Sequence, residues 1–169
     1  MTTPKPFSLD YSYTIVGGDV PLKARICIER NKIFFDYLHI PFKVIEFTPQ
    51  KTASHEADKM RLTKAATEPD ILYLDWDLLI LDLPHINTPE NRPLFAHNPG
   101  HDRDIFYFYN GKHPDLFAEF LKTCDFDPAT NKLSYWIKLK FFDGKCGKIG
   151  KNTYHHYNLG QRGVVKDEP

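Results

Sequence analysis

The sequence has few cysteines and no excess of charge of either sign. Its 169 residues include three cysteines, and Lys+Arg and Asp+Glu both number 22, so the formal net charge is zero. Cys27, Cys124 and Cys146 lack the Cys-X-X-Cys spacing of a zinc site, and their odd number argues against a disulfide framework. The balanced charge gives no reason to expect a nucleic-acid partner. We expect reduced thiols in a cytoplasmic protein.

Long apolar runs are also missing. No segment approaches the roughly 20 consecutive apolar residues of a membrane-spanning helix, and the first residues contain no apolar signal-peptide core. With 41% hydrophobic and 14% aromatic residues, a chain of this length can bury one core but hardly two. We therefore expect one compact domain over residues 1–169 without a transmembrane segment. The sequence does not indicate an oligomeric state.

The first half of the chain alternates between strand and helix patterns. Aromatic and β-branched runs predict strands over residues 11–16, 42–47 and 71–75, and apolar spacing predicts helices over residues 21–37 and 55–66. Such alternation favours parallel strands joined by right-handed crossovers. The predicted fold class is therefore α/β, a single Rossmann-like domain with a mostly parallel central sheet flanked by helices.

For the two helices predicted in the first half, the sequence also predicts which residues face the core and where the second helix begins. Apolar residues at roughly helical spacing are predicted to form the core-facing stripe of the first helix: Leu22, Ile26, Ile28, Ile33, Phe34 and Tyr37. The positions left for solvent include Arg25, Glu29, Arg30 and Lys32. In the second helix, Ser54 is predicted to be the N-cap, with Glu56 and Asp58 in the first turn, where negative charge suits the helix dipole.

The second half of the chain is less regular. Residues 84–100 contain several prolines and little periodicity, which predicts a long loop. We expect a strand over residues 105–109, a strand or hairpin arm over residues 135–142, and a helix over residues 113–122. The apolar stripe of that helix is predicted to be core: Leu116, Phe117, Phe120 and Leu121.

Two aspartates separate two apolar runs in the middle of the chain. Asp75 and Asp77 flank Trp76, directly after the strand-like run 71–74 and directly before the apolar run 78–81. Open α/β sheets bind ligands at the carboxyl ends of such strands, and paired carboxylates supply the hard oxygen ligands that Mg²⁺ or Mn²⁺ prefers. Two further Asp-X-Asp tripeptides, at Asp102 and at Asp125, lack this strand context. The alternative reading of Asp75 and Asp77 is a polar strand terminus.

A longer pattern surrounds this tripeptide. Asp58-Lys59-Met60-Arg61, followed after a helical interval by Ile71-Leu72-Tyr73-Leu74-Asp75-Trp76-Asp77, resembles the DXD-containing sugar-binding region of retaining GT-A glycosyltransferases. That group includes capsular-polysaccharide, lipopolysaccharide and yeast-type mannosyl transferases. Three other segments also resemble the family, at residues 15–18, 110–117 and 154–160. The chain departs from the family in having Glu68-Pro69-Asp70 in place of a Gly-Gly pair, and in lacking a Ser-Trp pair after the His-His segment.

The resemblance implies a function and a set of site residues. It implies a GT-A-like fold and a hexosyltransferase that takes a UDP- or GDP-hexose as donor, retains the anomeric configuration and depends on Mn²⁺ or Mg²⁺; it does not name the acceptor. In such an enzyme Asp77 would bind the ion directly, and Asp75 would contact the ribose or bind the ion through water. His156 or His155 would be the third ligand, although paired histidines also suit a surface loop.

The resemblance also implies donor contacts. Val16 and Gly17 would belong to the nucleotide loop, Trp76 would lie beside the donor, and Asp58 and Arg61 would meet the donor sugar or ribose. An ordinary surface ion pair is the alternative for Asp58 and Arg61. Further candidates are Lys148 and Lys151 for the diphosphate and Tyr13 or Phe7 for the base, with solvated lysines and core aromatics as their alternatives; Tyr107 and Tyr109 have no assigned role.

Two other classes of function remain open from the sequence. The run His97-Asn98-Pro99-Gly100-His101-Asp102-Arg103-Asp104 has the side chains of a metal-dependent phosphodiesterase or nuclease. A non-catalytic carbohydrate-binding or interaction module on a decayed transferase scaffold is the third possibility, because a fold does not determine a function.

Overall fold

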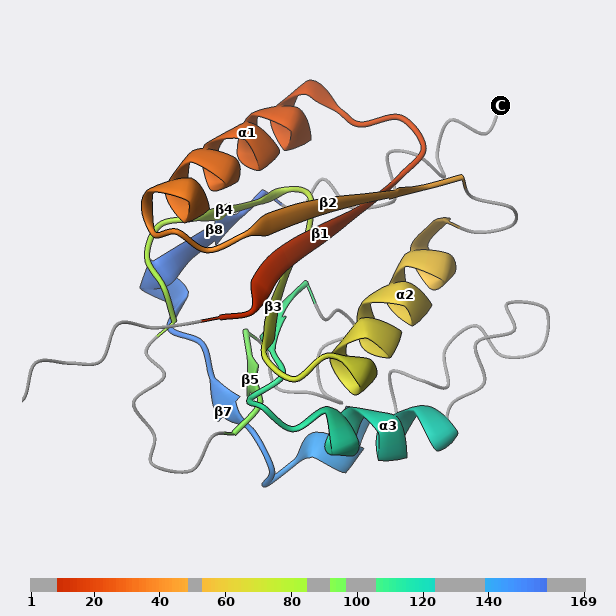
Figure 1. The fold of residues 1–169 in the computed structure, drawn as a ribbon. Helices are drawn as coiled ribbons and strands as arrows, with labels where there is room; N and C mark the ends of the chain where they lie inside the picture. The colour runs from red at the N-terminus through yellow and green to blue at the C-terminus, as the bar shows by residue number, and fades with distance from the viewer. Residues whose placement is uncertain (1–8, 49–52, 85–91, 97–105, 124–138, 158–169) are drawn as a thin grey trace, which may run out of the picture.

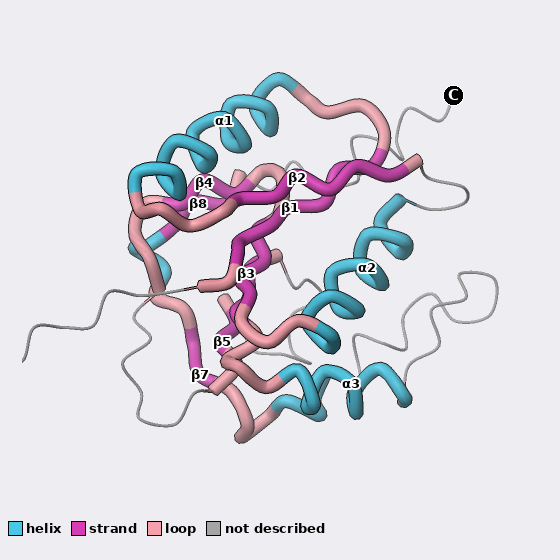
Figure 2. The backbone as a smooth tube through the Cα atoms, viewed as in Figure 1, coloured by secondary structure: helices cyan, strands magenta, loops and turns pink. Residues whose placement is uncertain are grey.

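A central sheet separates the helices into two layers (Figure 1). The computed structural model describes residues 9–48, 53–84, 92–96, 106–123 and 139–157. The main sheet has six strands in the order β2-β1-β3-β6-β5-β7, and a second sheet pairs β4 with β8. One helix, α1, covers one face of the main sheet, whereas α2 and α3 cover the other (Figure 2).

The first half of the chain builds the parallel part of the sheet. Strand β1 (Tyr11–Gly17) pairs in parallel with β2 (Phe42–Phe47) and with β3 (Ile71–Leu74). The connections run through α1 (Leu22–Tyr37) and α2 (Ala53–Thr67). All residues of β1 and β3 are buried because helices cover both faces, which explains their unbroken apolar and aromatic character. The predicted α/β fold class and its mostly parallel sheet are confirmed.

The second half adds antiparallel strands. Strand β6 (Tyr107–Tyr109) runs antiparallel to β3, and β5 (Leu94–Phe95) runs antiparallel to β6. Strand β7 (Gly147–Lys148) closes this edge in parallel with β5. The predicted helix at residues 113–122 is α3 (Pro114–Lys122), in which Phe117 and Phe120 are buried and Leu116 and Leu121 are partly buried, as predicted.

The second sheet brings the end of the described chain back to its middle. Strand β4 (Leu78–Ile80) pairs antiparallel with β8 (Tyr154–His156), in a register that places Leu78 opposite His156. The short 3-10 helix η2 (Lys151–Thr153) leads into β8. Sequence patterns did not predict β8, because three residues are too few to establish a period of two.

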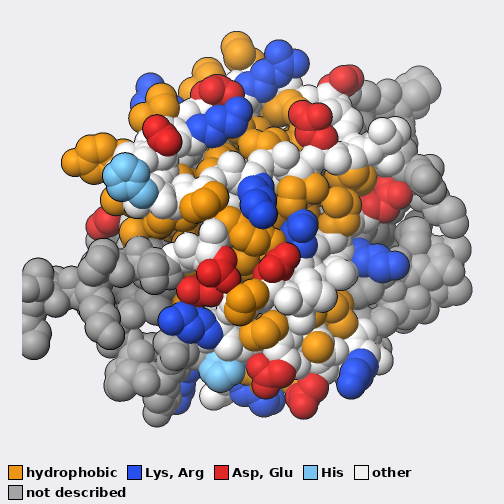
Figure 3. Space-filling model, viewed as in Figure 1, with side chains coloured by type: hydrophobic (Ala, Val, Ile, Leu, Met, Phe, Trp, Pro, Cys, Tyr) orange, Lys and Arg blue, Asp and Glu red, His pale blue; other side chains and the backbone are white. Residues whose placement is uncertain are grey.

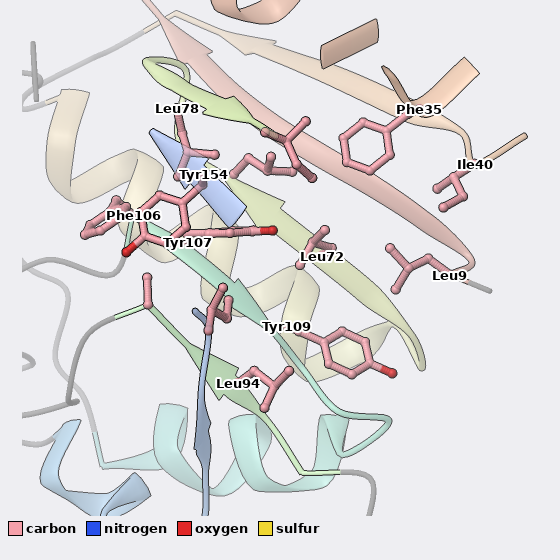
Figure 4. Close-up of a cluster of buried hydrophobic side chains, with 14 residues drawn as sticks. Leu9, Phe35, Ile40, Leu72, Leu78, Leu94, Phe106, Tyr107, Tyr109 and Tyr154 are labelled. Atoms are coloured by element: carbon pink, nitrogen blue, oxygen red, sulfur yellow. The ribbon is translucent and has the colours of Figure 1, made fainter. Parts of the chain in front are cut away.

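Two aromatic cores fill the spaces on either side of the main sheet. Tyr13, Tyr73 and Phe108 point toward α2 and α3, where they pack with Phe117 and Phe142. The other core lies toward α1 and the β4–β8 sheet, and Figure 4 shows its side chains, including Phe35, Tyr107 and Tyr154. Both cores form because side chains alternate between the faces of each strand. They fix β3, whose end carries Asp75.

The structure corrects four sequence predictions. Most of the predicted stripe of α1 faces outward: Leu22, Ile26, Ile33 and Tyr37 are exposed, whereas Ile28 is buried as predicted, on a face whose other members are Ala24, Cys27, Asn31 and Phe35. Helix α2 begins at Ala53, so Ser54 lies inside it and does not precede it. Where it is described, the predicted strand 135–142 is the 3-10 helix η1 (Leu139–Phe142). The predicted loop 84–100 contains β5.

Candidate metal and donor site

The carboxyl ends of the three parallel strands meet at one edge of the sheet. Asp75 follows β3 directly, and its backbone N–H donates to the carbonyl of Phe106 at 2.8 Å. Two residues later, Asp77 precedes β4, and its side chain is fully buried. Burying a carboxylate is costly unless partners compensate its charge, so the surroundings of both aspartates determine what they can do.

His156 is the first of these partners. Its Nε2 lies 3.0 Å from Oδ1 of Asp77 and 3.7 Å from Oδ2 of Asp75. The pairing of β4 with β8 places His156 next to the two aspartates. The backbone N–H of Tyr157 also donates to the carbonyl of Asp77 at 3.0 Å. The imidazole also stacks flat on Phe106, with ring centroids 4.0 Å apart and an angle of 6° between the planes. The ring is thereby held in one orientation.

Burial lowers the pKa of His156, but its hydrogen bonds to Asp75 and Asp77 and their charges outweigh this effect and raise the pKa to about 9. The imidazole is therefore protonated at neutral pH while no cation is bound. Ligand atoms of Asp75, Asp77 and His156 all lie within 4.8 Å of one another. Two carboxylates and one imidazole form a donor set that suits a divalent ion.

Arg61 is the second partner, and it approaches from α2. Its Nη2 lies 3.1 Å from Oδ1 of Asp58, one turn earlier on the same helix, and its Nη1 lies 3.5 Å from Oδ1 of Asp75. Both side chains of the Asp58–Arg61 pair are buried, so the pair is not the surface ion pair that sequence reasoning held open. The guanidinium lies 4.6 Å from the ring centroid of Tyr73.

Tyr73 completes the support of Asp75. Its hydroxyl donates to Oδ1 of Asp75 at 2.6 Å, and burial raises the pKa of this phenol well above its usual range, so it stays protonated. Sequence analysis missed this role and that of Phe106. Tyr73 stands two residues before Asp75 in the strand, so that both side chains reach the same face, and this spacing was the available signal.

Asn31 was also missed. It lies on the buried face of α1, where its side-chain amide donates to the carbonyl of Leu78 at 2.7 Å and accepts from the N–H of Ile80 at 3.0 Å. These two bonds fix β4 against α1 immediately after Asp77. A polar amide among the apolar positions of a helix was its signal, because buried amides are almost always paired.

A hollow lies at the carboxyl ends of β1 and β2, the same edge of the sheet at which β3 ends in Asp75. Val16, Gly18, Val20, Glu46, Phe47 and Thr48 line this cavity, which has a volume of about 410 Å³. Gly18 has φ of 85°, a conformation that favours glycine, and it turns the chain out of β1. A side chain at Gly17 would collide with the Phe47 ring. Val16 thus lines the cavity, and the absence of a side chain at Gly17 leaves room for the Phe47 ring, which also lines it.

Other predicted site residues lie elsewhere. His155 is exposed and packs against Tyr157, with ring centroids 4.3 Å apart, so the cluster contains His156 alone of the pair. Trp76 is buried against Val16, Ala24 and Ile28. It therefore anchors the chain between the two aspartates in the core. Tyr13 is fully buried, and its hydroxyl donates to the carbonyl of Arg61, so it is not available to stack on a base.

The remaining candidates are not part of the cluster. Lys148 is exposed on the edge strand β7, which β5 and β6 separate from β3, and Lys151 is exposed in η2. Tyr107 and Tyr109 are core residues, and the hydroxyl of Tyr109 donates to Asp70 at 2.6 Å. Phe7, the His97–Asp104 segment and the tripeptide at Asp125 lie outside the described residues.

The fold is GT-A-like, an α/β domain of the class found in glycosyltransferases. A solved glycosyltransferase involved in the glycosylation of the major capsid of PBCV-1 aligns over 92% of this chain and 99% of that chain, with a TM-score of 0.58 and 14% identity. A Drosophila β1,4-galactosyltransferase 7 mutant, in complex with manganese, UDP-Gal and xylobiose, aligns over 92% of this chain and 74% of that chain, with a TM-score of 0.48 and 11% identity. Neither a protein-family model nor a curated protein matches the sequence.

Proposed function

We propose that the protein is a metal-dependent glycosyltransferase that moves a hexose from a nucleoside-diphosphate sugar to an acceptor. The observation that carries the proposal is that the cluster of Asp75, Asp77 and His156 and a cavity both lie at the carboxyl-end edge of the parallel strands in a GT-A-like sheet. In α/β folds this edge is where nucleotides bind. A cavity of about 410 Å³ is of the size that small-molecule ligands occupy.

Each part of the site has a role in the proposed reaction. The cavity lined by Val16 and Phe47 would hold the base, and Asp58 and Arg61 would orient the ribose or the donor sugar. Asp75, Asp77 and His156 would hold Mn²⁺ or Mg²⁺, and the imidazole nitrogen favours manganese, because Mg²⁺ prefers oxygen ligands. A divalent ion held by these residues would neutralise the negative charge that develops on the departing diphosphate.

The residues themselves provide orientation and charge balance. Tyr73 and Arg61 fix Asp75, and Phe106 fixes the ring of His156, so the ligand atoms are preorganised before the donor arrives. Preorganised groups lower a barrier because they need no further reorientation during the reaction. Substitutions in this supporting shell are therefore expected to weaken catalysis as well as metal binding.

Calorimetry of UDP and GDP binding tests the metal-dependent site. The wild-type protein should bind one of them much more tightly with Mn²⁺ than with a chelator, and Asp77→Asn should erase the difference because it removes a carboxylate ligand. Asp143→Asn changes an exposed aspartate beyond η1 and should behave like wild type. Equal affinity with and without Mn²⁺ would contradict the metal role.

Turnover assays separate the three classes of function. The proposed transferase consumes a nucleotide sugar in the presence of Mn²⁺, with slow hydrolysis when no acceptor is supplied. A phosphodiesterase or nuclease would instead consume nucleic acid, and a non-catalytic module would consume neither substrate. Consumption of nucleic acid alone would overturn the proposal in favour of chemistry at the His97–Asp104 segment.

We further propose that transfer retains the anomeric configuration. A single inverting displacement needs a carboxylate free to act as a base. At the described site, Asp58 and Asp75 contact Arg61, and Asp77 contacts His156, so each carboxylate is already paired with a cationic group. Proton NMR of the product should show an α-linkage formed from an α-linked UDP- or GDP-hexose. A β-linkage would make Asp102 or Asp104 the first candidate for a base.

A further inference from the structure

Helix α1 is apolar on two opposite faces. Its buried face packs on the sheet through Ala24, Cys27, Ile28 and Phe35. On the outer face Leu22 is 73% exposed, Ile26 47%, Ile33 72% and Tyr37 83%. Only two other large apolar side chains are classed as exposed among the residues that the structure describes, Leu81 and Tyr157, so the exposure is concentrated on one helix.

These four residues, called here the outer stripe of α1, form a continuous line. At about 100° per residue, Leu22, Ile26, Ile33 and Tyr37 fall within an arc of about 60° along the whole helix. Ile33 also lines a groove of about 340 Å³ with Ile40, Pro41 and Phe42, which extends the apolar surface toward the start of β2. An apolar patch of this continuity indicates an interaction surface.

Basic side chains flank the outer stripe of α1 on both sides. On the same helical wheel, Lys23 and Arg30 lie along one side, and Arg25 and Lys32 lie along the other, all of them exposed. Two acids, Glu29 and Asp36, both lie on the Arg25 and Lys32 side, where Glu29 is bound to Lys32 at 3.1 Å, so this flank is mixed and the Lys23 and Arg30 flank is purely basic. Figure 3 shows hydrophobic and Lys or Arg side chains side by side over α1 at the top of the molecule.

The charges distinguish between possible occupants. The exposed charged side chains of α1 are four basic and two acidic, for a net charge of +2, so packing two copies stripe against stripe would bring like net charges together, which is unfavourable. An anionic surface complements this net charge and the purely basic Lys23 and Arg30 flank. An apolar stripe bordered by Lys and Arg is the pattern of a helix that lies in the plane of a membrane interface.

We propose that the outer stripe of α1 docks on an anionic lipid membrane, with Leu22, Ile26, Ile33 and Tyr37 inserted among the headgroups and the flanking Lys and Arg side chains paired with lipid phosphates. The start of α1 adjoins the metal cluster, since Lys23 Nζ lies 5.2 Å from the ring centroid of Tyr157, the residue after His156. Docking therefore places the site within reach of the membrane surface. No helix in the described ranges is long and apolar enough to cross the bilayer, so the contact is peripheral.

Co-sedimentation of the full chain with vesicles tests the proposal. Wild-type protein should bind vesicles that contain phosphatidylglycerol, and should bind pure phosphatidylcholine vesicles at least tenfold more weakly, with the difference shrinking as salt is added. Ile33→Glu should weaken binding to the anionic vesicles by more than about tenfold, because it removes apolar contact and adds repulsion. Arg30→Gln should weaken the same binding roughly fivefold, because it removes one basic contact.

Leu81→Glu is the matched control. Leu81 is 54% exposed beyond the end of β4 and is not part of the outer stripe of α1, so its replacement adds the same charge outside the stripe and should leave vesicle binding unchanged. Equal urea midpoints for the variants and wild type will show that each chain is folded. The proposal is overturned if wild type ignores anionic vesicles, if Leu81→Glu and Ile33→Glu bind alike, or if sedimentation velocity shows a dimer that Ile33→Glu dissociates.

Discussion

His156 sets the link between metal binding and pH at the level of single residues. Its pKa, about 9, lies above the usual value near 6.5, so the metal-free folded protein holds a proton that the unfolded chain releases more readily. This contact stabilises the fold fully below about pH 6.5, and the stabilisation is lost as the pH rises to about 9. A cation bound as proposed would take the place of this proton.

Metal binding should therefore release about one proton per ion near neutral pH, and affinity should rise about tenfold per pH unit up to about pH 9. Calorimetric titration of Mn²⁺ in buffers of different ionisation enthalpy measures this proton directly. His156→Gln should release none, and His155→Gln, altered at the exposed neighbour, should match wild type. A pH-independent affinity in the wild-type protein would show that His156 is not a ligand.

At the level of elements, β4 connects the metal cluster to α1. The side chain of Asn31 bonds both to the carbonyl of Leu78 and to the N–H of Ile80. Strand β4 in turn pairs with β8, which carries His156. The position of the imidazole thus depends on an amide in a helix that contributes no ligand.

Replacing that amide is expected to reduce both stability and metal binding. Asn31→Ala leaves two buried backbone groups without partners, which costs about 2 kcal/mol or more. Urea unfolding should show the loss, and Mn²⁺ titration should show weaker binding because β4 and β8 shift. Asn152→Ala, at an exposed asparagine of η2, should change neither. A stable Asn31→Ala protein with normal affinity would refute this role of β4.

The accuracy of sequence-based prediction also differs among elements. The boundaries of β2 and α3 agree with the sequence patterns, because alternation and a helical apolar stripe are local properties. The face of α1 was predicted wrongly because the helix has two apolar faces, and periodicity cannot tell which one meets the sheet. Strands β5, β7 and β8 depend on long-range pairing, which a run of two or three residues does not reveal.

The residues of the candidate site also differ in how well the sequence predicts them. Asp58, Arg61, Asp75 and Asp77 were predicted together because they form one sequence pattern, across a helix and the following strand, that resembles the sugar-binding region of a known family. Tyr73 and Phe106 were missed because their contacts depend on burial and on a strand more than thirty residues away. His156 could not be separated from His155 until the β4–β8 register was known.

For the whole molecule, binding of the proposed ligands at the cluster would stabilise the fold. The cluster and its partner Arg61 join α2, the β3 end and β8, so an ion and nucleotide bound there would contact only the native arrangement. At a ligand concentration about 100-fold above the dissociation constant, binding stabilises the fold by about 2.7 kcal/mol. For a chain of 169 residues this corresponds to a Tm increase of about 5–10 °C.

Thermal unfolding followed by circular dichroism checks this expectation. Wild-type protein with Mn²⁺ and its preferred nucleoside diphosphate should unfold about 5–10 °C higher than with a chelator. Asp77→Asn should show almost no shift, whereas Asp143→Asn should show the full shift. An equal shift for both variants would place the ligand away from the cluster.

The separation of Asp77 and His156 along the chain also bears on protein synthesis. The two residues are 79 positions apart, and chains emerge from the ribosome starting with their N-terminal end. Both carboxylates are therefore synthesised well before the imidazole that balances them. The complete proposed ligand set first appears after residue 156 has been translated, so chains truncated before that residue should lack full metal affinity.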